Sequence, residues 1–202
     1  MNMKNIVQEG SIEIAARAYY SKLLVMINKV KACDRNEALG FYQAIEMVGQ
    51  LILAQIDSKH KILFIGNGAS ASISSHMATD FWKNGGMRAI SFNDSSLLTC
   101  VSNDYSYSQV FAKPIEMFAD QGDLLFAISS SGRSENIVRG VTAAKEKGCH
   151  VVTLSGFAEN NPLFSLGEYN FHVPIHDYGP VEIIHHSICH CILDSILKAK
   201  NG

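Results

Sequence analysis

The sequence has no excess of positive charge and no long hydrophobic run. Its 202 residues include 17 Lys and Arg against 19 Asp and Glu, which gives a formal net charge of −2. A nucleic-acid-binding surface needs clustered basic residues, so this balance argues against one. No apolar run approaches the roughly 18–20 residues of a membrane-spanning helix, and the N-terminus lacks the apolar core of a signal peptide. We therefore expect a cytoplasmic protein that binds neither nucleic acid nor a membrane.

The five cysteines show neither a disulfide framework nor a zinc pattern. Their number is odd, and the chain is neither short nor secreted in character, so we expect reduced and mostly buried thiols. Cys189, His190 and Cys191 are consecutive, and successive residues of a helix point about 100° apart. They do not converge on one ion, so a cysteine-based zinc site is not expected.

Apolar residues change their spacing near residue 58. Before it, they recur at three- and four-residue steps on either side of residues 33–36, which predicts a helical hairpin over residues 1–58. Both apolar stripes are wide, which favours burial against more than one neighbour in a homo-oligomer. From residue 59 to 202, apolar runs alternate with helical segments, which is typical of a parallel sheet. The runs are 62–65, 88–92, 123–128, 150–154 and 169–173.

This alternation predicts an α/β fold with a flavodoxin-like, doubly wound sheet of five parallel strands. At 202 residues, with 47% of them hydrophobic, the chain is long enough for one large domain with a sufficient core. We expect a single domain over residues 1–202, with the hairpin at 1–58 and the α/β core at 59–202. In such sheets, ligands bind at the carboxyl ends of the strands.

The first strand end has a glycine turn without a known nucleotide-binding pattern. Gly66, Asn67 and Gly68 follow the run 62–65, and a helix is predicted from Ser70. No Gly-Lys-Ser/Thr follows, and Ala71 replaces the third glycine of G-x-G-x-x-G. Small residues at a helix start allow an anion to reach the backbone N–H groups. The alternative is an ordinary turn with a capping serine.

A serine-rich turn follows the third strand. Residues 126–136 read FAISSSGRSEN, and the hydroxyls with the next helix start are suited to a phosphate dianion. An ordinary serine-rich turn is the alternative, but two such loops at the ends of strands in one sheet favour a ligand site. Asp94 follows the second strand, where it can either accept a hydrogen bond from a sugar hydroxyl or cap the next helix.

Ionisable residues recur at four-residue spacing on two predicted helices. His76 and Asp80 share one helix face, and Glu182, His186 and His190 step by four along the last helix. The last helix is otherwise apolar, so its polar ladder needs partners or must face a cavity. This pattern favours a site.

Four stretches resemble the SIS (sugar isomerase) domain family. They are residues 66–76 (GNGASASISSH), 103–105 (NDY), 127–134 (AISSSGRS) and 181–190 (VEIIHHSICH). The serine stretch is similar to the whole superfamily, whereas the positions of His76 and His190 resemble its phosphoheptose isomerase branch. The similarity covers nearly the whole chain. It implies a homotetramer of flavodoxin-like subunits with active sites at subunit interfaces.

The resemblance implies a role for each matching position. The catalytic residues would be Asp80, Glu182 and His190. The substrate-binding residues would be Asn67, Ser70, Asp94, Ser129, Ser130, Ser131, Ser134 and Glu182. The ligands of one Zn²⁺ per subunit would be His76, Asp80, Glu182 and His190, a set of donor types that suits this ion. Three positions depart from the family: Asp80 replaces Glu, Glu182 replaces Gln, and Arg133 replaces Asn.

The resemblance further implies an aldose–ketose isomerase that converts sedoheptulose 7-phosphate into D-glycero-D-manno-heptose 7-phosphate. The product would supply nucleotide-activated heptose for lipopolysaccharide or capsule. Asp80 or Glu182 would be the base and His190 the acid. The alternative is a non-catalytic SIS protein that binds a phosphosugar or a replication initiator. Relatives that bind the initiator lack the histidine of the closing helix, so His190 favours the enzyme.

Overall fold

The computed structural model describes residues 10–35 and 37–201, which form a sheet between two layers of helices. The sheet has seven strands in the order β2-β1-β7-β6-β5-β3-β4. Their bounds are β1 (Lys31–Asp34), β2 (Glu37–Leu39), β3 (Ile62–Gly66), β4 (Ala89–Ser91), β5 (Leu124–Ser129), β6 (His150–Gly156) and β7 (Tyr169–Val173). No helix in the described part of the chain is long and apolar enough to cross a membrane.

Five of these strands confirm the prediction of a flavodoxin-like sheet. The pairs β4/β3, β3/β5, β5/β6 and β6/β7 are all parallel. Counted from β3, their spatial order is 2-1-3-4-5, the flavodoxin-like order. The chain leaves β3 toward one side for β4 and returns to the other side for β5. The carboxyl ends of β3 and β5 therefore lie next to each other at the switch point, where ligands bind in such sheets.

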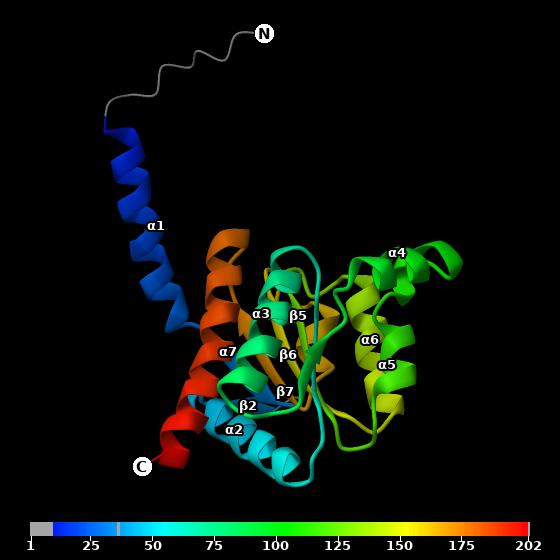
Figure 1. The fold of residues 1–202 in the computed structure, drawn as a ribbon. Coiled ribbons are helices and arrows are strands. Elements are labelled where there is room, and N and C mark those ends of the chain that lie inside the picture. The colour runs from blue at the N-terminus through cyan, green and yellow to red at the C-terminus, as the bar shows by residue number, and fades with distance from the viewer. Residues whose placement is uncertain (1–9, 36, 202) are drawn as a thin grey trace.

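The prediction of a helical hairpin over residues 1–58 is wrong in one respect. The two helices exist, as α1 (Ser11–Ile27) and α2 (Phe41–Asp57), but β1 and β2 separate them. These strands pair with each other, and β1 pairs antiparallel with β7. They cover an edge that would otherwise expose unpaired N–H and C=O groups. α1 projects from the body of the molecule, while α2 lies under the sheet beside α7 (Figure 1).

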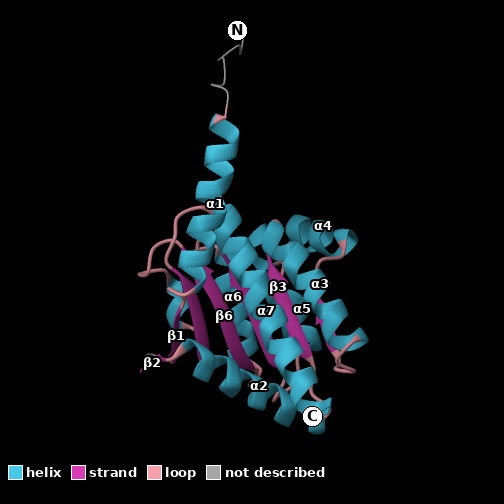
Figure 2. Cartoon of the chain, turned by 90° about the vertical axis from the view of Figure 1, so that its left-hand side faces the viewer, coloured by secondary structure: helices cyan, strands magenta, loops and turns pink. Residues whose placement is uncertain are grey.

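The helices cover both faces of the sheet, so successive strand residues are buried on opposite sides. α2, α3 (Ala69–Lys83) and α7 (Tyr178–Asn201) lie on one face, and Figure 2 shows α7 laid across the strands. The other face is covered by α4 (Ser95–Asp104), α5 (Ala112–Phe118) and α6 (Glu135–Glu146). Short 3-10 helices occur at Tyr107–Gln109 and Pro162–Ser165.

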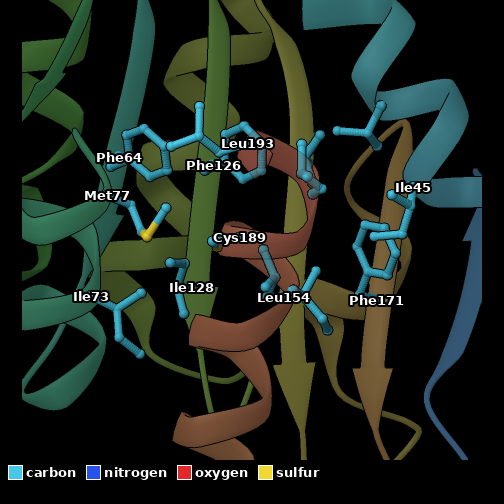
Figure 3. Close-up of a cluster of buried hydrophobic side chains, with 14 of the residues drawn as sticks. Ile45, Phe64, Ile73, Met77, Phe126, Ile128, Leu154, Phe171, Cys189 and Leu193 are labelled. Atoms are coloured by element: carbon cyan, nitrogen blue, oxygen red, sulfur yellow. The ribbon is translucent and has the colours of Figure 1, made fainter. Parts of the chain in front are cut away.

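Aromatic packing fixes α3 on the sheet. The rings of Phe64 and Phe126 stack with centroids 4.9 Å apart, and Phe81 of α3 meets Phe64 edge-on at 5.4 Å. Figure 3 shows Phe64, Phe126 and Met77 together, with Cys189 of α7 in the same cluster. Burying a large apolar side chain contributes about 1.5–3 kcal/mol. α3 and α7 are thus held in one position relative to the ends of β3 and β5.

His185 of α7 lies wholly within this packing. Its Nε2–H donates to the backbone carbonyl of Ser155 at 2.9 Å. Burial lowers the pKa of this imidazole to about 4 from an ordinary value of 6.5. The folded protein therefore holds His185 neutral where an unfolded chain would already be protonated.

This difference predicts a pH-dependent stability. Between pH 6.5 and 4, the unfolded chain binds more protons than the folded one. The contribution of His185 to the free energy of unfolding is therefore present above pH 6.5 and is lost as the pH falls. From pH 6.5 to 5, we expect the free energy of unfolding to fall by about 2 kcal/mol more in the unaltered protein than in His185→Gln. Glutamine keeps an N–H donor but does not titrate. Urea unfolding measures the free energy of unfolding of the unaltered protein and of His185→Gln at each pH. The same pH dependence in the two proteins would refute this account.

Candidate functional site

A cavity of about 230 Å³ opens at the carboxyl ends of β3 and β5. Most of the substrate-binding residues predicted from the sequence meet there. The lining residues are Asn67, Gly68, Ala69, Ser70, Ser129, Ser130, Ser131, Ser134, Tyr178 and Glu182. A larger cavity of about 510 Å³, lined by Arg35, Lys145 and His150 among others, lies at the opposite edge, by the amino end of β6.

The glycine turn after β3 brings the start of α3 directly to this cavity. A Cβ on Gly66 would lie 2.4 Å from the carbonyl oxygen of Ser70, and Gly68 has a φ of +55°. Only glycine fits both positions without strain. No side chain of the described chain caps the start of α3. Its first N–H groups and the positive end of its dipole are therefore available to an anion.

The serine loop after β5 also leads into a helix start that has no side-chain cap. Ser134 stands at the N-cap position of α6, but its hydroxyl makes no capping hydrogen bond. The Ser129 hydroxyl accepts a hydrogen bond from Gly132 N–H at 3.2 Å, and that of Ser131 accepts from Arg133 N–H at 3.2 Å. Two helix starts without side-chain caps and a set of hydroxyls thus line one cavity. This arrangement can bind a phosphate dianion with neutral donors.

Asn67 is held in place by residues that the sequence analysis did not single out. Its side-chain amide exchanges two hydrogen bonds of 2.9 Å with Asn136, and the Tyr107 hydroxyl donates to its oxygen at 3.0 Å. Asn136 is buried at the start of α6, so it ties the turn after β3 to the loop after β5. Nothing in the local sequence pattern marks Asn136 or Tyr178 as part of a site.

One predicted contact, Asp94, and the arginine of the serine loop lie elsewhere. Asp94 is not among the residues that line the cavity, and it caps α4 by accepting from the N–H groups of Ser96 and Leu97 at 2.9 and 3.0 Å. This is the alternative role that the sequence allowed for Asp94. Arg133 turns away, because its guanidinium donates to the backbone and side-chain oxygens of Asn160. No arginine is therefore among the described residues that line the serine cavity.

Three histidines meet where α3 passes α7. One ligand nitrogen each of His76, His186 and His190 lies within 4.8 Å of the others. Their ring centroids are 4.6–5.6 Å apart. Asp80 Oδ2 lies 3.3 Å from Nε2 of His76. Burial and the neighbouring imidazoles of His190 and His76 lower the pKa of His186. The group offers imidazole nitrogens beside one carboxylate.

The structure regroups the four residues predicted as metal ligands. His76, Asp80 and His190 are neighbours, but Glu182 lies outside the histidine group and lines the serine cavity instead. His186, one turn further along α7, completes the group. Its signal was present in the sequence, because it is four residues from both Glu182 and His190. Glu182 thus lies between the serine cavity and the histidines.

The residues of the histidine group fit a divalent metal ion. Nε2 of His186 is buried and has no hydrogen-bond partner in the described structure. A buried nitrogen without a partner is costly, and a metal ion would satisfy it. Imidazole and carboxylate are the donor types that Zn²⁺ takes in proteins.

Comparison with known proteins shows which family the chain resembles. The SIS domain family model matches residues 27–156. The phosphoheptose isomerase of Coxiella burnetii (strain Dugway 5J108-111) is 36% identical over 163 residues, which cover 76% of this chain and 79% of that protein. The phosphoheptose isomerase of Thermodesulfovibrio yellowstonii is 32% identical over 164 residues, which cover 76% and 81%.

Solved structures share the whole architecture. Phosphoheptose isomerase GmhA from Neisseria gonorrhoeae superposes with a TM-score of 0.81 at 25% identity, covering 92% of this chain and 99% of that one. A phosphoheptose isomerase from Francisella tularensis, at 23% identity and a TM-score of 0.79, shows the same fold. The family model spans more than half of the chain, and both sequence relatives align with about three quarters of it. This chain therefore belongs to the SIS domain family and, within it, to the phosphoheptose isomerases.

Proposed function

We propose that the protein is an aldose–ketose isomerase that converts sedoheptulose 7-phosphate into D-glycero-D-manno-heptose 7-phosphate. The observation that carries this proposal is the adjacency of a serine-lined cavity to Glu182 and the histidine group. The names of the relatives support a heptose phosphate as substrate. We further propose that the enzyme works in the cytoplasm and supplies nucleotide-activated heptose for lipopolysaccharide or capsule.

The serine cavity binds the phosphate end of the substrate. The hydroxyls of Ser70, Ser129, Ser131 and Ser134 and the starts of α3 and α6 surround the dianion with neutral donors. Hydrogen bonds to a charged phosphate are stronger than those between neutral groups. Asn67, fixed by Asn136 and Tyr107, stands beside the phosphate where the sugar chain begins. Binding at one end orients the rest of the sugar.

A carboxylate, Asp80 or Glu182, carries the proton between the two carbons. Isomerisation removes a carbon-bound proton next to the carbonyl, forms an enediol and returns a proton to the neighbouring carbon. Glu182 lines the cavity, whereas Asp80 is turned toward His76. Both carboxylates that the sequence left open as base remain candidates: Asp80 stands where the family has Glu, and Glu182, which replaces a Gln, lines the cavity. The histidine group then contacts the oxygens of the reacting carbons. It includes His190, the predicted acid.

We also propose that the histidine group binds one Zn²⁺ per subunit. A divalent ion bound there would supply a Lewis acid that stabilises negative charge on the sugar oxygens during enediol formation. The imidazoles hold the ion, and Asp80 orients His76 through the 3.3 Å contact with its Nε2.

We also propose that the chain assembles as a homotetramer through α1. No residue of this helix is buried in the isolated chain. Its exposed apolar side chains are Ile12, Ile14, Tyr20, Leu24 and Val25. A projecting helix with such a surface is stable when a second copy of the chain covers it.

Activity is tested with purified, untagged protein and a panel of phosphorylated ketoses, with aldose formation followed by NMR. We expect turnover of sedoheptulose 7-phosphate and little turnover of unphosphorylated sedoheptulose. Replacing both candidate bases, Asp80→Asn together with Glu182→Gln, should lower kcat by about 10²- to 10⁴-fold, the usual contribution of general acid–base catalysis. His190→Ala should also lose turnover. If no phosphoketose reacts, the protein is a binding member of the family and the proposal fails.

Phosphate recognition is tested by Ser134→Ala. The loss of one hydrogen bond to the phosphate costs about 1–2 kcal/mol, so KM should rise about 5- to 30-fold with kcat nearly unchanged. Ser195→Ala, at an exposed position of the same chain, is the matched control. An unchanged KM in Ser134→Ala would show that the phosphate binds elsewhere.

Assembly is tested by light scattering at micromolar concentration. The expected mass is four times the 22.2 kDa of one chain. Replacing Ile14 and Leu24 together by Glu places charges in the apolar surface of α1 and should yield smaller species, because burying unpaired charges is costly. A stable monomer of the unaltered chain would disprove assembly through α1.

A further inference from the structure

Tyr178 is the one aromatic side chain among the described residues that line the serine cavity. It is the first residue of α7 and lies four residues before Glu182. The ladder formed by Glu182, His186 and His190 therefore begins one turn earlier, at Tyr178. Because Tyr178 is 62% exposed, it stands at the solvent side of the cavity rather than in its floor.

Aromatic packing supports the Tyr178 ring despite this exposure. The ring meets that of Phe157 edge-on, with centroids 4.9 Å apart, and Phe157 stacks in turn on His176 at 5.7 Å. The backbone of Phe157 has a φ of +59°, which is uncommon for a residue other than glycine. Such a conformation persists where the surrounding structure holds it, and Phe157 N–H donates to the carbonyl of Ile175 at 3.1 Å. The Tyr178 ring thus rests against a fixed neighbour.

The hydroxyl of Tyr178 makes no hydrogen bond to another residue in the described ranges 10–35 and 37–201. The Tyr107 hydroxyl, by contrast, already donates to Asn67. A phenol O–H can donate to a phosphate oxygen, and such a bond to a charged group is stronger than one between neutral groups. Because the ring is supported, little side-chain freedom is lost when the hydroxyl binds a ligand.

The charges around the cavity favour a neutral donor at this position. Glu182 contributes a carboxylate to the lining, and Arg133 of the serine loop donates to Asn160 instead. A cationic side chain in the cavity would pair with the Glu182 carboxylate. The phenol of Tyr178 adds a donor for a dianion without adding charge.

We infer that Tyr178 is a further substrate-binding residue, whose hydroxyl donates to the phosphate that the serines bind. It adds a fifth hydroxyl to those of Ser70, Ser129, Ser131 and Ser134, all of which line the same cavity. The inference rests on the proposed function for the phosphate as the ligand of this cavity. It does not depend on which carboxylate moves the proton.

The test uses Tyr178→Phe, which keeps the ring and removes only the hydroxyl. We expect KM for sedoheptulose 7-phosphate to rise about 5- to 30-fold with kcat nearly unchanged. The Kd of inorganic phosphate, measured by isothermal titration calorimetry, should rise by a similar factor. Tyr42→Phe makes the same change at an exposed position of α2 that does not line the cavity, and it should match the unaltered protein.

A raised phosphate Kd in Ser134→Ala with an unchanged Kd in Tyr178→Phe would overturn the inference and leave the serine cavity as the phosphate site. A fall in kcat of Tyr178→Phe without a change in Kd would also overturn it, because the hydroxyl would then act on the sugar. If neither variant changes the Kd, phosphate binds elsewhere and both proposals fail. If Tyr178→Phe weakens phosphate binding but no phosphoketose is isomerised, the role of Tyr178 stands and the proposed activity fails.

Discussion

The packing of α3 and α7 on one face of the sheet is the constraint on which the site depends. Phe64, Phe81 and Phe126 fix α3 above β3 and β5, and the buried side of α7 closes over the same cluster. Each helix is then fixed both in its rotation about its own axis and in its position on the sheet. Because side chains in a packed core change position only at a cost, the polar residues on the facing sides are held in place. The site is therefore a consequence of the core beneath it.

This geometry divides the site by chemistry. At the switch point of the sheet, hydroxyls and two helix starts without side-chain caps provide neutral donors for a dianion. One turn along α7, imidazoles and a carboxylate provide a place for a cation. Glu182 lies between the two. A substrate with a phosphate at one end and a ketose at the other matches this order, and the family relationship points to the same class of molecule.

Much of this arrangement follows from the sequence, but some of it depends on packing. The five parallel strands were predictable because each is an apolar run that ends in a turn. β1 was not, because a strand of four residues whose place in the sheet depends on pairing with distant β7 leaves little local signal. Glu182 and His186 share a four-residue ladder, and spacing cannot say which of them faces α3. Asp94 was open between a sugar contact and a helix cap, and hydrogen bonds to α4 distinguish these roles.

The central claim is that the serine cavity and the residues along α7 act on one phosphorylated sugar. A crystal structure of the double variant Asp80→Asn, Glu182→Gln with sedoheptulose 7-phosphate tests this most directly. The account predicts the phosphate on the loop Ser129–Ser134 and the start of α3, with C1 and C2 within about 3–4 Å of residue 80 or residue 182, close enough for proton transfer. Phosphate bound instead in the larger cavity beside Arg35, Lys145 and His150 would contradict it.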